Sequence, residues 1–405
     1  MPLSKKQLKI LAFPYSRYQA LICYGSIRAG KTSLMTVAFV DWMMREYDRQ
    51  HFILLGHTVG SAVRNVIDTY MATAYARERY GLKFASSAGV LTITGNGREN
   101  YLHVFGADNA RSFQKIQGMT AAGLLVDEVT LCDRSAVEQA MARCSVEGSR
   151  YWFNCNPDSP RHWFHEEWVL RADEMNALNL HFTLDDNPSL SREVIERYQR
   201  QYHGVFHDRY IKGLWVVAEG LVYQLDGVDY RCSPEEAYGD GKGLWYVSCD
   251  YGITNPFAAI LWRVTPDRAY AVDEYYFDSR REGRRKTDAE HADALERLCL
   301  GKNVECVVID PSATSMKEEL WRRGRMDVRD ANNNVLEGIS VTDQMLHGGS
   351  VKISESCLST LSEFGLYRWD DKSAKDAVIK ENDHAMDAMR YAVNTVLKYD
   401  LRGYC

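Results

Sequence analysis

One stretch of the chain has the residue types and spacing of a phosphate-binding loop. Residues 25–32 read Gly-Ser-Ile-Arg-Ala-Gly-Lys-Thr and match the pattern Gly-x-x-x-x-Gly-Lys-Ser/Thr. The glycines let successive backbone N–H groups point inward at an anion. Lys31 can reach the β- and γ-phosphates of ATP, and the Thr32 hydroxyl can ligate Mg²⁺. We therefore predict that the nucleotide is bound by Gly25, Ser26, Arg28, Ala29, Gly30, Lys31 and Thr32.

Two acids at the end of an apolar run fit the other half of such a site. Residues 123–126 are apolar, and Asp127 and Glu128 follow them directly. Asp127 would hold the Mg²⁺ shell, and Glu128 would polarise the attacking water as a general base. Most Asp-Glu pairs in this position are only a solvated strand end, so the pair is a weak signal by itself. Combined with the loop at 25–32, it becomes a strong one.

Further polar residues could serve this site on weaker grounds. Asn154 and Asn156 end an apolar run and could sense the γ-phosphate, although Asn-Pro turn chemistry explains them equally well. Gln19 could hydrogen-bond the adenine, and capping of the first strand is an equal alternative. Arg111 and Lys115 could touch DNA or nucleotide, but a solvated loop is the favoured interpretation of both.

Acids also end apolar runs in the C-terminal half. Asp250 and Asp310 each follow such a run, and Asp383, His384 and Asp387 begin a helical stretch in which 383 and 387 share a face. Clustered carboxylates repel one another and suit two Mg²⁺ or Mn²⁺ ions that clamp a phosphodiester for attack by water. Helix capping and the helix dipole would explain the helical acids alone, but not the strand-end acids as well. We predict a nuclease metal site whose third ligand is left open among the three helical residues.

Apolar periodicity predicts the elements that must position the first site. In the N-terminal half we expect a helix after the loop, a helix from Ser61 to Gly81, and strands at 20–24, 51–56, 90–94, 101–105, 123–126 and 151–157. The strands 90–94 and 101–105 are expected to form a hairpin. Strands alternating with helices are typical of a mostly parallel sheet with helices on both faces. We predict an α/β fold whose N-terminal part is a P-loop ATPase domain over residues 1–185.

The second site requires a different order of elements. We expect strands at 245–250, 258–264, 269–277, 304–309 and 350–353 and helices at about 287–300, 315–323 and 383–392. This is the order of a ribonuclease-H-like domain, in which the first and fourth strands lie side by side and parallel. Asp250 and Asp310 would then point at the same spot. We predict this nuclease domain over residues 234–405, after a helical connector over 186–233.

Composition limits the partners of the chain. No run of about 18 apolar residues is present, so we expect no membrane partner. Ten cysteines without a C-x-x-C pair favour reduced thiols in a cytoplasm. The net charge of −6 argues against a permanent nucleic-acid coat, but not against transient DNA contact through local basic patches. The candidate patches are residues 280–286 and the group Arg322, Arg323 and Arg325.

In combination these motifs resemble the large terminase subunit of tailed bacteriophages, and most of all its PBSX-like group. The resemblance covers nearly the whole chain, through 25–32, 124–128, 154–157, 187–188, 213–220, 250–252, 310–312 and 383–391. It implies an ATP-driven motor that pumps double-stranded viral DNA into a procapsid, with a C-terminal nuclease that cuts the concatemer. It also implies ATP and Mg²⁺ (Mn²⁺ possible at the nuclease site), docking as a homo-oligomer (typically a pentamer) on the portal protein, and a small terminase subunit that selects the DNA. The place of action would be the host cytoplasm.

Two other functions are weighed against this one. A helicase–nuclease of recombination or repair would need helicase motifs, such as an arginine-bearing block in a second motor domain, where the C-terminal half has acids. A non-catalytic DNA-binding scaffold would not need intact Lys31, Asp127 and Glu128, nor the strand-end acids Asp250 and Asp310.

Overall fold

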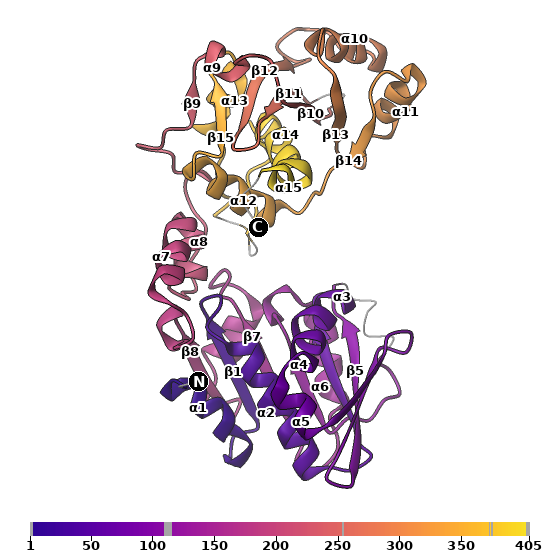
Figure 1. Ribbon diagram of the computed structural model, residues 1–405, viewed down its shortest axis with the longest axis vertical. Coiled ribbons are helices and arrows are strands. Elements are labelled where there is room, and N and C mark those ends of the chain that lie inside the picture. The colour runs from indigo at the N-terminus through magenta and orange to yellow at the C-terminus, as the bar shows by residue number, and fades with distance from the viewer. Residues whose placement is uncertain (1–2, 109–115, 253–254, 372, 374–375, 402–405) are drawn as a thin grey trace. The chain divides into compact units, whose positions relative to one another are not determined.

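A computed structural model describes residues 3–108, 116–252, 255–371, 373 and 376–401 (Figure 1). Arg111 and Lys115 therefore lie outside the described residues. The chain divides into two compact units, each described by itself below. Unit 1 is Met1–Gln199 with Val205–Val217, and unit 2 is Arg200–Gly204 with Ala218–Cys405. Within the described ranges, no helix combines the length and apolar character needed to span a membrane.

Unit 1 is built on an eight-stranded sheet in the order β3-β4-β5-β2-β6-β7-β1-β8. The strands are β1 Ala20–Gly25, β2 His51–Gly56, β3 Gly81–Ala85, β4 Val90–Gly95, β5 Arg98–Gly106, β6 Gly123–Val126, β7 Arg150–Cys155 and β8 Ala177–Phe182. All neighbours from β5 to β8 along this order are parallel, and β3, β4 and β5 form an antiparallel edge. The mostly parallel sheet and the hairpin of β4 and β5 confirm the prediction. The order also places β7 between the strands that carry the loop and the Asp-Glu pair.

Helices cover both faces of this sheet, because alternate residues of the buried strands point to opposite sides. Leu21 and Cys23 of β1 pack with the helices α1 Lys5–Ala12, α2 Lys31–Glu46, α3 Val59–Ala62, α4 Thr69–Met71 and α5 Ala74–Arg79. Ala20 and Ile22 pack on the other face with α6 Arg134–Arg143 and the π-helix His165–Val169. Short helical turns lie at Phe13–Tyr15, Val129–Leu131 and Leu184–Asp186.

The single helix expected from Ser61 to Gly81 is wrong in detail. Helix α3 begins two residues earlier, at Val59, and passes through a π-helical stretch at Val63–Asp68 into α4, which ends at Met71. The chain then breaks before α5, because Thr73 takes an extended conformation and its hydroxyl accepts a hydrogen bond from the Ala76 N–H. A threonine that caps a new helix in this way ends the preceding one.

The stretch expected as a helical connector contains two helices, α7 Arg192–Gln201 and α8 Gly204–Tyr210. By its contacts, the segment 205–217 belongs to unit 1, whereas 200–204 belongs to unit 2. From residue 211 to 230 the backbone is irregular. The helical expectation therefore applies to only part of this stretch.

Unit 2 has a seven-stranded sheet in the order β14-β13-β10-β11-β12-β15-β9. The strands are β9 Arg231–Cys232, β10 Leu244–Asp250, β11 Phe257–Val264, β12 Ala269–Phe277, β13 Val304–Ile309, β14 Val328–Asp330 and β15 Val351–Ser354. The first long strand, β10, pairs antiparallel with β11 and parallel with β13. This pairing confirms the predicted neighbourhood of the strands that end at Asp250 and before Asp310.

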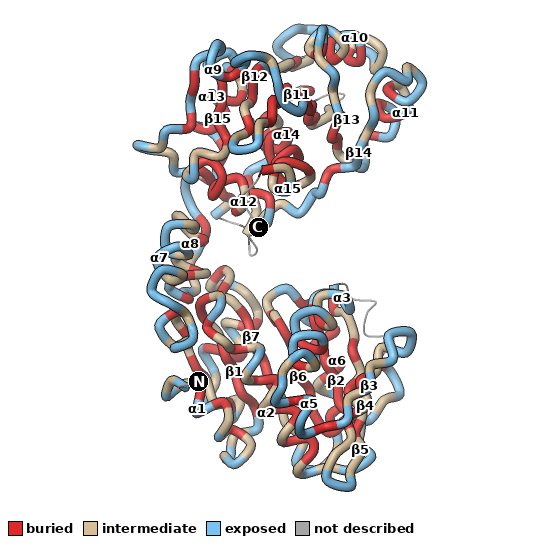
Figure 2. The backbone as a smooth tube through the Cα atoms, viewed as in Figure 1, coloured by how far each residue is buried: buried red, intermediate tan, exposed pale blue. Residues whose placement is uncertain are grey.

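The helices of unit 2 are α9 Pro234–Tyr238, α10 Asp288–Leu298, α11 Thr314–Arg323, α12 Val335–His347, α13 Leu358–Phe364, α14 His384–Ala392 and α15 Lys398–Asp400, with a π-helix at Val393–Leu397. Val247 and Cys249 of β10 pack on the side of α9, α10 and α11. Strand alternation therefore turns Asp250 to the opposite face, where α14 lies against β10 and β11. Figure 2 shows α14 as a buried element. Helices α12 and α13 were not predicted from the sequence.

Candidate catalytic sites

Backbone conformation shapes the predicted phosphate loop. Gly25 has φ of 136°, and a Cβ atom there would lie 1.9 Å from the carbonyl oxygen of Phe182, so only glycine fits. Arg28 and Gly30 have φ of 56° and 79°, in the left-handed region. Helix α2 begins directly after the loop at Lys31, so its N-terminal N–H groups face the loop. Such a concave backbone with a helix N-terminus is an anion site.

The side chain of Lys31 lies within this loop and is buried. Its ammonium group donates to the carbonyl oxygens of Gly25 (3.1 Å) and Ser26 (2.6 Å) and to Oδ1 of Asn156 (3.1 Å). Burial lowers the pKa of Lys31 to about 8, and the acids Asp127 and Glu128 offset only part of that effect. The cation is therefore held at the loop by acceptors that phosphate oxygens can replace.

Asp127 is the centre of a hydrogen-bond network between three elements. Its carboxylate accepts from the Thr32 hydroxyl (3.1 Å) and the amides of Asn154 (2.9 Å) and Asn65 (3.2 Å). A threonine hydroxyl beside a carboxylate at a phosphate loop is the donor set that Mg²⁺ takes. The site thus fits the predicted metal, and Asn154 touches it directly. Asn65 was not predicted, because it lies in the π-helical stretch far from any motif.

Glu128 is held in a strained backbone conformation next to this network. Its φ of 55° and ψ of 55° are left-handed, and its N–H donates to Oδ1 of Asn154 (3.2 Å). Burial and then the charge of Asp127 raise the pKa of Glu128, against the opposing effect of Lys31. A raised pKa makes a carboxylate a stronger base. Strain at a half-buried polar residue such as Glu128 is a common mark of a functional position.

These residues surround one cavity of about 590 Å³. Its lining consists of Ile27, Arg28, Ala29, Gly30, Lys31, Thr32, Ser33, Asn65, Thr69, Asp127, Glu128, Asn154, Asn156, Asn187 and Leu190. The structure therefore brings together both asparagines and most of the predicted ATP residues. Gln19 is exposed and does not line this cavity; its backbone N–H donates to Asn176. The structure offers no support for its proposed contact with adenine.

The loop is supported by the chain that follows the sheet. The Ile27 N–H donates to the carbonyl oxygen of Tyr210 (2.9 Å), and the Asn187 amide donates to that of Arg28 (2.7 Å). Gly213 lies so close to the loop that a Cβ atom would approach Gly25 Cα to 2.7 Å and the Ser26 nitrogen to 2.8 Å. The residues after β8 thus pack directly on the phosphate-binding backbone.

In unit 2, the structure brings Asp250 and His384 together. Oδ2 of Asp250 lies 2.8 Å from Nδ1 of His384, the first residue of α14. Burial raises the pKa of Asp250; the hydrogen bond to His384 opposes this, and the charges of Asp387 and Asp383 add to the increase. The aspartate that ends β10 therefore faces the start of α14, as predicted.

Asp310 is held in place by uncharged donors. Its Oδ2 accepts from the Tyr391 hydroxyl (2.9 Å) and the Asn333 amide (2.9 Å), and its Oδ1 accepts from the Ser312 N–H (2.7 Å). Burial acts to raise the pKa of Asp310, but the hydrogen bonds from Ser312 and Tyr391 outweigh it and leave the pKa below its usual value. The carboxylate is therefore charged and fixed in orientation, which suits a metal ligand.

Asp383 and Asp387 lie on one face of α14, as their spacing predicts. Lys380 lies 3.3 Å from a carboxylate oxygen of Asp383 and 3.1 Å from one of Asp387, and Arg390 donates to Asp387 at 3.0 Å. Asp383 occupies the N-cap position, but within the described residues its side chain makes no capping hydrogen bond. The capping alternative therefore does not account for it. The two acids together bind the positive charge of Lys380, and a divalent cation could bind to them in the same way.

Glu363 of α13 holds the start of this helix. Its Oε2 accepts from the N–H groups of Ala385 (2.8 Å) and Met386 (3.2 Å), and its Oε1 accepts from the Tyr276 hydroxyl (2.8 Å). Burial raises the pKa of Glu363 to about 7 against these hydrogen bonds. Nothing in the sequence near Glu363 indicates this contact, because it joins elements distant in the chain.

The two basic patches differ in their surroundings. Arg322, Arg323 and Arg325 form ion pairs with Glu319, Asp293 and Glu296, so acids of their own unit already neutralise them. In the other patch, Arg280, Arg281 and Arg285 are exposed, while Arg284 pairs with Glu290. Residues 280–286 are thus the better of the two surfaces for phosphate groups.

Together the two units define a P-loop ATPase joined to a ribonuclease-H-like nuclease domain. Two family models match them in the same order. "Terminase large subunit, T4likevirus-type, N-terminal" matches residues 22–227, and "Terminase RNaseH-like domain" matches residues 249–395. The chain therefore belongs to the large terminase subunit family of bacteriophages, with that family's ATPase and nuclease domains. The predicted family and fold class are confirmed.

Individual relatives agree with this assignment. The chain is 42% identical to the large terminase of a thermophilic bacteriophage, covering 98% of this chain and 100% of that one with a TM-score of 0.92. The same relative in complex with ADP gives a TM-score of 0.90. The large terminase subunit of Escherichia phage T5 is 23% identical over 252 residues, which span 58% of this chain and 56% of that protein.

Proposed function

We propose that this chain is the motor and nuclease of a viral DNA-packaging machine. The observation that carries the proposal is the pairing, on one chain, of a complete nucleotide-site network around Asp127 with a set of acids at the carboxyl ends of β10 and β13. Unit 1 would convert ATP hydrolysis into movement of double-stranded DNA, and unit 2 would cut the concatemer. We propose the domain bounds 1–185, 186–233 and 234–405, with the contacts of the middle stretch shared between the two units.

In unit 1, ATP would lie against the loop 25–32; the complexes of the thermophilic-phage terminase with ADP and ATP-gamma-S support nucleotide binding by this chain. Lys31 would exchange its carbonyl partners for phosphate oxygens, and Thr32 and Asp127 would hold Mg²⁺. The bound ion would screen the phosphate charge. Glu128 would accept a proton from the attacking water. Asn154 touches both Asp127 and the Glu128 backbone, so it would pass the loss of the γ-phosphate on to β7.

In unit 2, Asp250, Asp310 and Asp387 would hold Mg²⁺ or Mn²⁺, which would activate water and stabilise the leaving oxygen. Asp387 is favoured over Asp383 as the third ligand, because it is spaced i, i+4 from Tyr391 on α14, and the Tyr391 hydroxyl donates to Asp310. His384 would then orient Asp250 through its hydrogen bond. Lys380 would leave the acids when cations bind.

The partners follow from the family. The chain would act on double-stranded DNA at the portal protein of a procapsid, as a homo-oligomer that is a pentamer when docked, with a small terminase subunit, in the host cytoplasm. The exposed arginines of 280–286 would hold the phosphate backbone without reading bases. Family membership sets aside the helicase–nuclease alternative, and the intact ATP-site network argues against a non-catalytic scaffold.

The test is a packaging assay with purified chain, procapsids that bear portals, and linear double-stranded DNA. With ATP, DNA should become protected from an added external nuclease, and the Lys31→Ala variant should protect none. Protection that does not require ATP hydrolysis would overturn the proposal. A matched sample without procapsids shows whether DNA binding alone gives protection.

A further inference from the structure

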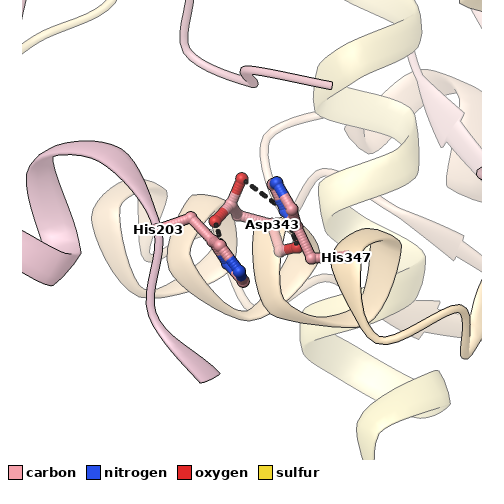
Figure 3. A group of neighbouring side chains, drawn as sticks. All are labelled: His203, Asp343 and His347. Carbon is pink, nitrogen blue, oxygen red and sulfur yellow. Dashed lines mark hydrogen bonds and ion pairs between the residues drawn. The ribbon is translucent and has the colours of Figure 1, made fainter. Parts of the chain in front are cut away.

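Unit 2 contains a cluster of metal-ligating side chains that neither catalytic site uses (Figure 3). Asp343 and His347 are spaced i, i+4 on helix α12, so their side chains project from one face. His203 comes from the segment that follows α7. One ligand atom from each residue lies within 4.8 Å of those of the other two. No motif predicts the cluster, because the three residues come from segments far apart in the chain.

The distances in the cluster are those of a coordination site. Nδ1 of His203 lies 3.6 Å from Oδ2 of Asp343, and Nδ1 of His347 lies 3.3 Å from Oδ1 of the same carboxylate. The two imidazole rings are stacked with centroids 3.7 Å apart. In a tetrahedral zinc site with bonds of about 2.0–2.2 Å, neighbouring ligand atoms are about 3.4 Å apart. Figure 3 shows the carboxylate facing both rings.

Burial and neighbouring contacts also suit an ion. The side chains of Asp343 and His347 are 7% and 12% exposed, whereas that of His203 is 32% exposed. The segment is already held at this place, since the Gln201 amide donates to Oε1 of Gln344 on α12 (2.7 Å). To bind one ion with both rings, at least one of the two stacked imidazoles would rotate, because a metal ion lies in the plane of each imidazole that binds it.

We propose that His203, Asp343 and His347 bind one transition-metal ion, of which Zn²⁺ is the best match. Two imidazole nitrogens and one carboxylate oxygen suit Zn²⁺, whereas Mg²⁺ prefers oxygen ligands alone. Nδ1 of His347 lies 2.9 Å from the backbone oxygen of Asp343, so binding either uses the other ring nitrogen or displaces a proton from this one. A water molecule completes the four ligands.

The ion has a structural role. Residues 200–204 are the short segment of unit 2 that lies in the sequence between two segments of unit 1. Coordination by His203 would fix this segment on α12, beyond the single hydrogen bond of Gln201. The site therefore stabilises one of the places where the chain passes between its two units.

The test measures zinc binding by competition with a chromophoric chelator, on the tag-free full chain above neutral pH. The background is Asp250→Asn with Asp310→Asn, so that the predicted nuclease acids do not contribute. The parent should bind one Zn²⁺ per chain. The variants His203→Gln and His347→Gln should bind it at least about tenfold more weakly. Equal affinity in parent and variants, or no zinc bound by the parent, would overturn the proposal.

A matched control and a second readout separate binding from misfolding. His207→Gln changes a histidine of α8 whose side chain, at 30% exposed, resembles that of His203 but lies outside the cluster, so it should bind zinc like the parent. Zinc should also slow trypsin cleavage after the exposed Arg200 in parent and control, but not in the cluster variants. If zinc does not change the rate of trypsin cleavage in the parent, the rings of His203 and His347 only stack on each other and hold no ion.

Discussion

At the scale of single residues, the acids were predictable, but only some of their partners were. Asp127, Glu128, Asp250 and Asp310 each follow an apolar run, and strand ends in an α/β sheet are where such acids meet. Two of their hydrogen-bond partners, Asn65 and Asn333, come from other segments and carry no motif. The same holds for Lys380, which pairs with Asp387, and for Glu363, which accepts from the Ala385 N–H. The third nuclease ligand could not be chosen from the sequence, because Asp383 and Asp387 share a helical face.

The Glu128→Gln variant tests the general base of the ATPase. The amide keeps the size of the side chain but cannot accept the proton of the attacking water. ATP should still bind, while steady-state hydrolysis should fall about 10²-fold or more. Glu138→Gln is the control, because it removes an acid of similar type from an exposed i, i+4 ion pair on α6. Near wild-type turnover in Glu128→Gln would assign the base to another residue.

The variants Asp250→Asn and Asp310→Asn test the nuclease site. Each should abolish metal-dependent nicking of plasmid DNA, because each carboxylate supplies charge that the other cannot replace. The double variant should be little worse than either single one, since groups that act as one unit are non-additive. ATPase rates should be unchanged. A folded single variant that cuts at the wild-type rate would contradict the metal site, and the same assay on Asp383→Asn, His384→Ala and Asp387→Asn would rank the third ligand.

At the scale of elements, close packing holds each site in place. The sequence predicted the strands and the loop, but not that the chain near Gly213 lies against the loop backbone. It also did not predict that α13 supports the start of α14. Both are contacts between segments whose own periodicity is unremarkable, and such contacts depend on tertiary packing, which local patterns do not encode.

Gly213→Ala should impair the ATP site through the backbone. A Cβ atom would lie within 2.8 Å of the Ser26 nitrogen and would push the loop out of position. We expect ATP turnover to fall at least about tenfold, as misplacement of a catalytic loop does. Gly97→Ala is the control: its φ of 75° resembles the 71° of Gly213, but no atom lies within 4 Å of its Cβ position. Both variants should lose about 1–2 kcal/mol of unfolding free energy from backbone strain; equal ATP turnover in the two would refute the packing argument.

Glu363→Gln should change how stability depends on pH. The pKa of Glu363 is about 7 in the folded chain and 4.5 in the unfolded chain, so the folded state binds more protons between these values. Wild-type stability at this residue therefore falls as pH rises from 4.5 to 7, by up to about 3 kcal/mol. The Gln variant has no such loss. Its free energy of unfolding, measured with denaturant, should therefore rise relative to that of the wild type as the pH increases from 4.5 to 7. If the wild type instead becomes more stable relative to the variant as the pH rises, the charged carboxylate stabilises α14 and the prediction is wrong.

At the scale of the whole molecule, the chain carries two separate chemistries. The order of elements allowed both sheets to be predicted, including the parallel neighbours β10 and β13. The assignment of 205–217 to unit 1 and of 200–204 to unit 2 could not be predicted from the sequence, because the chain crosses between the units more than once. Family models covering 22–227 and 249–395 agree with a division of labour between two domains.

The most direct test of this division is the DNA-nicking rate of the Lys31→Ala variant in Mn²⁺ without ATP. The hydrogen-bond acceptors of Lys31 are Gly25, Ser26 and Asn156, all of which belong to unit 1. Its loss should remove most ATP turnover, while the nicking of naked plasmid stays close to the wild-type rate. A folded Lys31→Ala protein that no longer nicks DNA would contradict this division, because DNA cleavage in unit 2 would then depend on the ATP site of unit 1.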